Sequence, residues 1–358
     1  MQKNIISNMK STNDFQEKIC FFLLVPIILL SCNRSPVAKE FMLQDNWQFR
    51  NTAEGEWLPA AVPGCVHTDL LANGKIEDPF YRLNEHGQQW IDKTDWEYLC
   101  IFKIPGEVLK MDVVEIFFRG LDTYADVYLN DGLILRADNM FREWKADIRE
   151  NLVAGDNELR IYFHSPVKLG LEKLGQLDYE FPAPPNDLSE IGGIGDNKVS
   201  IFTRKAGYHF GWDWGPRFVT SGIWKEVIIR AWDRARIEDL FVQQDEISEE
   251  KAVLTAILDI RSSKADSLKL RGTVNGAEII SSDLKLSAGT NRVRETFTIE
   301  NPELWWPNGL GDQPMYDISF SLSDRASVIS QKGIRTGLRT IEIVQDADDK
   351  GETFYFNS

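Results

Sequence analysis

Short segments that are apolar throughout, or that alternate between apolar and polar residues, recur along the chain from about residue 41. A period of two is typical of β-strands, because successive side chains point to opposite faces. In the first half of the chain the pattern predicts strands at Val113–Phe118, Tyr124–Leu129, Glu158–His164 and Ile223–Ile229. Asn130-Asp131-Gly132 directly follows the second strand and is a typical hairpin turn. Regular short strands with such turns predict an all-β sandwich or barrel over residues 41–233.

A second run of alternating segments begins near Ala235 and predicts a second β-domain. Its clearest strands are Val253–Ile260, Leu268–Val274 and Val293–Ile299. Asn275-Gly276 marks another hairpin between two strands. We place this domain at residues 234–337, which is the size of an immunoglobulin-like sandwich of about 100 residues. The length of 358 residues also fits two or three domains.

The strand pattern lapses between His164 and Ile201. A short helix-like piece near Leu169–Leu174 is followed by segments rich in proline and glycine, Phe181–Pro185 and Gly192–Gly195. Connections this long inside a compact domain are uncommon and are usually functional or disordered. We interpret the segment as part of the rim of a binding site, because it ends just before the motif described next.

Trp212-Asp213-Trp214 is the most informative motif of the chain. Flanking glycines and Pro216 indicate a sharply turning loop, and loops on a rigid scaffold often carry binding groups. The flat apolar faces of Trp212 and Trp214 suit stacking against a sugar ring, and Asp213 can accept hydrogen bonds from two vicinal hydroxyls. The alternative is an aromatic packing corner with Asp213 turned outward. His209 either donates a hydrogen bond to Asp213 or to the sugar, or is a structural histidine.

Around this loop, Arg204–Arg217 resembles the signature of the β-mannosidases of glycoside hydrolase family 2. Further segments match that family in order along the chain: Val62–Leu71, Asp78–Tyr81, Trp96–Tyr98, Gly120–Asn130, Asp138–Trp144, Thr220–Trp224 and Leu304–Gly309. The resemblance implies a galactose-binding-like jelly-roll followed by an immunoglobulin-like β-sandwich. It also implies hydrolysis of terminal non-reducing β-D-mannose residues with retention of configuration, and a mannose-containing oligosaccharide or glycoside as the ligand. Trp305-Trp306-Pro307 looks like a platform for a sugar, but the family resemblance implies that this segment packs in the core.

In that family two glutamates on a (β/α)₈ barrel perform the reaction, and the jelly-roll lends its loop to the barrel's pocket. The resemblance therefore implies that Asp213 contacts the terminal mannose, with Trp212, Trp214 and His209 around it. Residues 338–358 resemble the lead-in to the barrel, and no stretch matches either glutamate motif. We therefore expect the N-terminal part of an enzyme, with no catalytic residue in this chain and no activity alone, and possible pairing with a separately encoded barrel. The alternative is a non-catalytic carbohydrate-binding or remnant protein.

The sequence does not decide the roles of several charged residues near the loop. Arg204, Lys205 and Arg217 either form salt links that steer the loop or belong to a solvated rim. Asp122 and Asp126 are interpreted as turn and surface residues, not as a catalytic pair.

The N-terminus predicts export. Lys18 precedes the apolar run Ile19–Leu30, which is too short to span a bilayer and fits a signal-peptide core. Leu29-Leu30-Ser31-Cys32 resembles a bacterial lipobox, so we expect residues 1–32 to be a signal peptide and lipobox, with cleavage just before Cys32, which would then receive the lipid. Residues 33–40 would tether a periplasmic or outer-membrane lipoprotein. The alternative is a plain signal peptide that contains a cysteine.

Composition excludes some functions. The net charge of −15 and pI near 4.9 argue against nucleic acid binding, which requires a basic face. Four scattered histidines and the absence of a Cys-x-x-Cys pair predict no metal site, and no cofactor is expected. Cys65 and Cys100 either pair or remain free thiols, and their strand-like apolar surroundings favour free thiols.

Overall fold

The computed structural model describes residues 38–53, 55–179, 182–183, 187–188, 197–325, 327–345 and 354–357, with side chains up to residue 341. The predicted signal segment, Cys32 and most of the predicted tether lie outside these residues, as do most of Phe181–Pro185 and all of Gly192–Gly195. Within the described residues, no helix is both long enough and apolar enough to cross a membrane.

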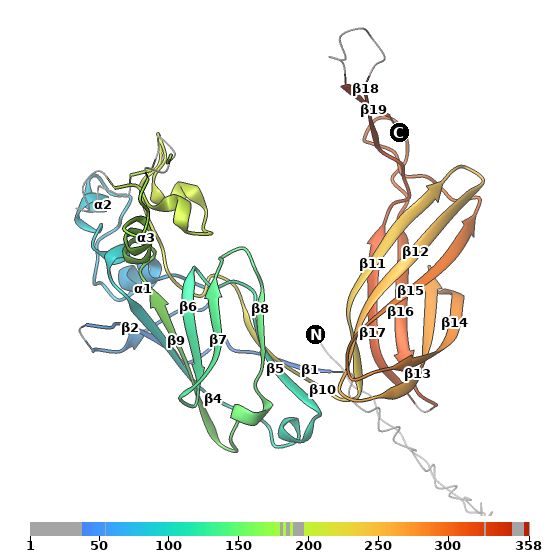
Figure 1. Ribbon diagram of the computed structural model, residues 1–358, viewed down its shortest axis with the longest axis horizontal. Coiled ribbons are helices and arrows are strands. Elements are labelled where there is room, and N and C mark those ends of the chain that lie inside the picture. Colours follow the sequence, from blue (N-terminus) through green and yellow to red (C-terminus); the bar gives the residue numbers. More distant parts are fainter. Residues whose placement is uncertain are drawn as a thin grey trace, which may run out of the picture. The chain divides into compact units, whose positions relative to one another are not determined.

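The first domain is a sandwich of two antiparallel sheets (Figure 1). The smaller sheet has the order β1 (Lys39–Met42), β10 (Val227–Trp232), β5 (Val113–Phe118), β8 (Trp144–Asp147). The larger sheet has the order β3 (Leu58–Pro59), β2 (Trp47–Asn51), β4 (Trp96–Lys103), β9 (Asp156–His164), β6 (Tyr124–Leu129), β7 (Gly132–Asp138). Apolar residues of both sheets form one core, which includes Phe49 and Tyr98 of the larger sheet and Ile116 of the smaller.

The alternation of the sequence explains these strands. In β9 every second side chain is buried, as a sheet with one covered face requires. β5 and β6 have the predicted bounds, and the predicted hairpin joins β6 to β7. Asn130 and Asp131 there have φ of 48° and 65°. Two consecutive positive φ values match the turn whose twist suits a two-residue hairpin.

Short helices gather at one end of this sandwich (Figure 1). They are α1 (Val66–Ala72), α2 (Asn84–Gly87), η1 (Ile91–Lys93), α3 (Pro166–Leu174), η5 (Ser200–Phe202) and η6 (Gly207–Phe210), the η elements being 3₁₀ helices. Two further 3₁₀ turns, η2 (Val108–Lys110) and η3 (Arg149–Asn151), lie in other connections. The helix expected near Leu169–Leu174 is confirmed by α3. It starts at the Ser165 cap, whose hydroxyl accepts from the Lys168 amide at 3.1 Å, with Pro166 in the first turn.

The strand predicted at Ile223–Ile229 was placed too early, because β10 begins only at Val227. Ile223 instead accepts a hydrogen bond from the Gly64 amide at 2.8 Å, beside α1. Gly222 has φ of 152°, and a Cβ there would lie 2.7 Å from Cys65 Cα. Before it enters β10, the chain therefore packs directly against the segment that precedes α1. Only glycine fits at this point of contact.

The second domain is a sandwich of three strands on four, all antiparallel. The three-stranded sheet has the order β11 (Ala235–Ile247), β12 (Lys251–Ser262), β15 (Gly289–Glu300). The four-stranded sheet has the order β14 (Ala277–Leu286), β13 (Asp266–Val274), β16 (Tyr316–Ser323), β17 (Val328–Thr336). The three predicted strands and the Asn275-Gly276 hairpin are confirmed, and seven strands around one core form an immunoglobulin-like fold. β18 (Glu342–Gln345) and β19 (Phe354–Asn357) form a separate hairpin.

Trp305 and Trp306 are half-buried against the second sandwich. The Trp305 amide donates to the Leu338 carbonyl at 2.8 Å, and the Arg339 guanidinium lies 4.7 Å from the Trp305 ring centroid. These contacts fit the structural packing implied for this segment.

Candidate functional site

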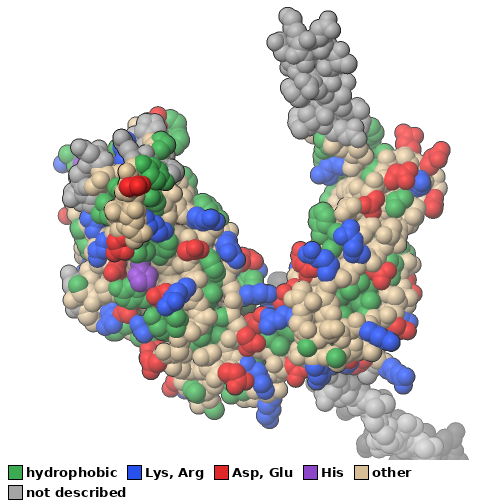
Figure 2. All heavy atoms as spheres, viewed as in Figure 1, with side chains coloured by type: hydrophobic (Ala, Val, Ile, Leu, Met, Phe, Trp, Pro, Cys, Tyr) green, Lys and Arg blue, Asp and Glu red, His purple; other side chains and the backbone are tan. Residues whose placement is uncertain are grey.

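The Trp-Asp-Trp motif lies on a loop at the helical end of the first sandwich, in the yellow-green segment of Figure 1. Trp212 is 43% exposed and Trp214 is 81% exposed. Asp213 between them is exposed and has no hydrogen bond or ion pair with any described residue. Hydrophobic side chains are visible at this end of the sandwich in Figure 2. An unpaired carboxylate between two exposed indoles leaves all three side chains available to a ligand.

The local backbone explains how the motif is displayed. η6 ends at Phe210, which is 1% exposed and packs in a small cluster with Val167, Val199 and Val219. Gly211 has φ of 131°, so the chain turns sharply after this anchor. Trp212 and Gly215 then form an antiparallel bridge, and the two indole rings lie 5.6 Å apart at 88°. The motif is thus a tight tip with two aromatic faces at right angles and a carboxylate between them.

His209 has a partner other than Asp213. Its Nδ1 lies 3.0 Å from the Thr220 hydroxyl, and no bond to Asp213 is present among the described residues. Burial, together with the positive charge of Lys205, lowers the pKa of His209 to about 4. The imidazole is therefore neutral at neutral pH, and this contact is the one expected of a structural histidine.

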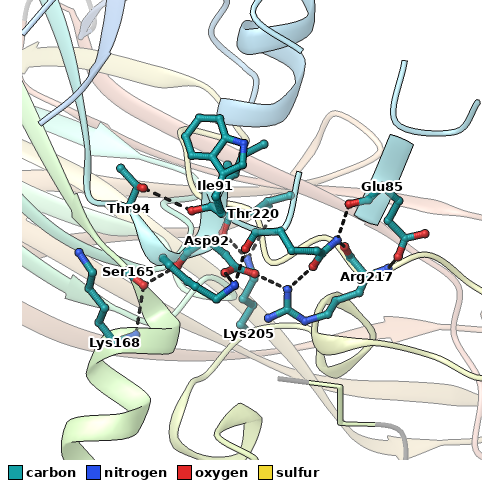
Figure 3. A network of polar contacts seen from close by, with 12 residues as sticks. Glu85, Ile91, Asp92, Thr94, Ser165, Lys168, Lys205, Arg217 and Thr220 are labelled. Atoms are coloured by element: carbon teal, nitrogen blue, oxygen red, sulfur yellow. Dashed lines mark hydrogen bonds and ion pairs between the residues drawn. The ribbon is translucent and has the colours of Figure 1, made fainter. Parts of the chain in front are cut away.

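Lys205, at the start of the loop, has a fully buried side chain, and Figure 3 shows it beside Thr220. Its ammonium forms an ion pair with Asp122 and donates to the Thr220 carbonyl at 2.9 Å and hydroxyl at 3.1 Å. Burial lowers the pKa of Lys205, while Asp122 acts in the opposite direction. The interpretation of Asp122 as a surface turn residue was wrong, because Asp122 is 2% exposed and pairs with this lysine. Asp126 is partly exposed, with its carboxylate 3.1 Å from His164 Nε2.

Arg217, at the end of the loop, is 1% exposed. Its Nη1 donates to Asp92 and to the Gln89 amide oxygen, and its backbone amide donates to Glu85 at 2.7 Å. Lys205 and Arg217 therefore form salt links and are not a solvated rim, whereas Arg204 is exposed.

The three partners of Arg217 were missed in the sequence. Glu85, Gln89 and Asp92 are separated by four and three residues, the spacing that aligns side chains on one helical face. They lie across α2 and η1, whose two short turns present them together. The spacing was visible in the sequence, but nothing there marked Arg217 as their shared partner.

His67 on α1 is another histidine near the loop, and it is buried. It is 8% exposed, its ring meets Phe218 edge-on with centroids 5.4 Å apart, and its Nδ1 has no hydrogen-bond partner among the described residues. Burial, followed by the charge of Lys205, lowers the pKa of His67 to about 4.

We expect His67 to make folding sensitive to mild acid. Burial holds its pKa at about 4 in the folded state, below the ordinary histidine value of 6.5, so the unfolded chain takes up the proton first as pH falls. The contribution of the neutral His67 to the free energy of unfolding is fully present above about pH 6.5. It decreases by about 2 to 3 kcal/mol as the pH falls toward 4. His67→Gln should reduce the fall in the free energy of unfolding between about pH 7 and pH 4.5, measured by urea denaturation.

The matched control is His86→Gln, because His86 is exposed on α2. It should retain the wild-type pH dependence. Equal pH dependence in wild type and His67→Gln would contradict the assignment of a neutral, buried His67.

Cys65 and Cys100 are free thiols, as favoured. Cys100 is buried, and burial raises its pKa to about 11, so it remains protonated. Cys65 is only half-buried and precedes α1.

Comparison with known proteins identifies the family. Residues 47–225 match the family model described as glycosyl hydrolase 2 galactose-binding domain-like, and residues 235–339 match glycosyl hydrolases family 2. The chain belongs to glycosyl hydrolase family 2. Its two sandwiches are the galactose-binding-like and sandwich domains of that family.

Similar proteins within the family are named β-mannosidases. Beta-mannosidase B of Emericella nidulans is 36% identical over 330 residues, covering 88% of this chain and 37% of the relative. Beta-mannosidase B of Aspergillus fumigatus is 34% identical over 326 residues, covering 89% and 37%. The crystal structure of β-D-mannosidase from Dictyoglomus thermophilum matches with a TM-score of 0.80 and 35% identity, covering 89% of this chain and 38% of that one. The chain thus spans less than two fifths of the length of these relatives.

Proposed function

We propose that this chain forms the N-terminal part of a retaining β-mannosidase and contributes the loop that binds the terminal non-reducing mannose. The observation that carries this proposal is the exposed Asp213, which lies between Trp212 and Trp214 and has no hydrogen bond or ion pair with any residue that the structure describes. Support comes from the family and from relatives named β-mannosidase at 34% to 36% identity. The ligand class is a mannose-containing oligosaccharide or glycoside.

The chemistry of the loop suits binding better than proton transfer. An ionised carboxylate accepts hydrogen bonds only, and two vicinal hydroxyls of one sugar can occupy its two oxygens. The buried carboxylates of Asp92 and Asp122, which pair with the two ends of the loop, are already in ion pairs. Contacts to hydroxyls remote from the scissile bond position the ring and help distort it toward the transition state.

Retention requires two carboxyl groups about 5 to 5.5 Å apart on either side of the glycosidic bond. We assign them to the part of the enzyme that the relatives have beyond the matched residues. Asp213 would then bind substrate without being acid, base or nucleophile.

A hybrid enzyme tests the proposal. Residues 47–339 of this chain replace the matching part of the Dictyoglomus thermophilum β-D-mannosidase, and hydrolysis of an aryl β-mannoside is measured. Changing the tip by Trp212→Ser, Asp213→Gly and Trp214→Ser should lower kcat/KM by about 100-fold or more. The unfolding midpoint should change little, because the three side chains are exposed.

Phe241→Ser is the matched control, since Phe241 is an exposed aromatic residue of the second sandwich, 57% exposed. It should leave kcat/KM unchanged. Unchanged kinetics in the folded triple variant would reject sugar binding by this loop.

A further inference from the structure

Buried ion pairs hold both ends of the loop that carries Asp213. Lys205 precedes the loop and Arg217 follows it, with side chains 0% and 1% exposed. Their partners, Asp122 and Asp92, are each 3% exposed. The partners come from different segments, since Asp122 lies between β5 and β6 and Asp92 lies in η1. Each end of the loop is therefore tied to a separate part of the sandwich.

These pairs are poor choices if stability is their only role. Removing two charges from water costs about as much as their attraction returns, and a well-packed apolar pair of similar volume is often as stable. Arg217 is also incompletely satisfied, because Nε and Nη2 have no partner among the described residues. What a hydrogen-bonded ion pair adds over an apolar contact is a defined direction and distance between the groups.

The three side chains of the tip make no hydrogen bond or ion pair with other described residues. Between the two charged ends, Phe210 and Gly211 are buried, but Trp212, Asp213 and Trp214 are all exposed. The tip's position therefore depends on the backbone on either side of it. A displacement of about 1 Å in a substrate-positioning group is enough to cost a large factor in rate.

We propose that Lys205–Asp122 and Arg217–Asp92 are positioning pairs that keep the Trp212–Trp214 tip at a defined place on the sandwich. The inference rests on the proposed function only for what the tip contacts. The positioning itself is a property of this chain and is measurable without substrate. Lys205, Arg217, Asp122 and Asp92 touch no sugar and act through the loop.

Hydrogen exchange on the full 358-residue chain tests the inference. The His209 and Gly211 amides donate to the Ala206 and Tyr208 carbonyls at 3.0 and 3.1 Å, so their exchange reports opening of the loop. In the double variant Arg217→Met/Asp92→Leu, no buried charge is left unpaired and the chain should fold. Exchange in residues 206–216 should rise by about tenfold or more, while β4 and β9 keep wild-type protection.

The control removes an ion pair remote in sequence from the loop. Arg292 and Asp259 form a paired contact in the second sandwich at 2.8 and 2.9 Å, and Arg292→Met/Asp259→Leu should leave exchange in the loop unchanged. Arg217→Lys, which keeps a charge for Asp92, should show loop exchange between wild type and the double variant. If the double variant does not fold, the comparison of loop exchange between Arg217→Lys and wild type tests the inference in its place.

Unchanged loop exchange in a folded double variant, or an equal rise in the loop and in β4, would overturn the inference. A parallel measurement in the hybrid enzyme separates it from the proposed function. If the loop opens and kcat falls more than KM rises, both stand. If the loop opens and hydrolysis is unaffected, positioning stands and sugar binding by the tip fails.

Discussion

Arg217→Met in the full chain is expected to lower the free energy of unfolding by about 3 to 5 kcal/mol at neutral pH. The change removes the close ion pair of Asp92, which is 3% exposed, and leaves it the longer contact with the Lys93 ammonium at 3.8 Å. It also removes the donor to the Gln89 amide oxygen. Urea denaturation followed by circular dichroism measures the loss. The penalty should be among the largest for any single substitution in the first sandwich, because it strands a charge in the protein interior.

The pH dependence of this loss distinguishes a stranded charge from lost packing. Burial already raises the pKa of Asp92 even with Arg217 beside it. Without Arg217 the pKa should rise further, so Asp92 takes up a proton more readily when folded than when unfolded. The penalty is then greatest at neutral pH and shrinks as pH falls toward the raised pKa. A penalty that is independent of pH would indicate lost packing alone.

Arg292→Met is the control for removing an arginine from an ion pair. Arg292 is exposed, and its partner Asp259 keeps contact with water, so the loss should be below about 1 kcal/mol. An Arg217→Met variant as stable as Arg292→Met would contradict the structure of the buried network.

Most strands of the fold could be predicted from local sequence patterns. β5 could be located to the residue because it is a continuous apolar run broken only by Glu115. β6 could be located because its period, its apolar content and the Asn130-Asp131-Gly132 turn agreed at one place. The β10 boundary was missed because Ile223 reads as a strand residue, whereas its carbonyl bonds to Gly64, far away in the sequence. Periodicity records which face of a segment is apolar, but it does not record which neighbour satisfies the backbone.

The two buried ion pairs at the ends of the loop could not be found from the sequence. Lys205 and Asp122 are separated by 83 positions, and Arg217 and Asp92 by 125. Charged residues are rarely buried unless paired, so a charged residue read alone is assigned to the surface. Asp213 was singled out because its neighbours in sequence, two tryptophans in a glycine-rich turn, are also its neighbours in space.

Asp213→Ala in the hybrid enzyme is expected to lower kcat/KM for an aryl β-mannoside about 30- to 1,000-fold. This corresponds to a loss of about 2 to 4 kcal/mol of transition-state stabilisation. The variant loses hydrogen bonds between a charged acceptor and the sugar, and such bonds are worth more than neutral ones. Because Asp213 is exposed and has no partner among the described residues, the free energy of unfolding should change by less than about 0.5 kcal/mol. Steady-state kinetics and urea denaturation of the same preparation measure both quantities.

Two further variants define what the carboxylate does. Asp213→Asn keeps the size of the side chain and one neutral acceptor, so its kcat/KM should lie between those of wild type and Asp213→Ala. Asp283→Ala removes an exposed aspartate from β14 and should change neither kinetics nor stability. If Asp213→Ala unfolds early while its folded fraction keeps wild-type kinetics, Asp213 is a structural turn residue. The two indoles would then belong to a packing corner and would not bind a sugar, because the carboxylate between them would contribute to the fold and not to substrate binding.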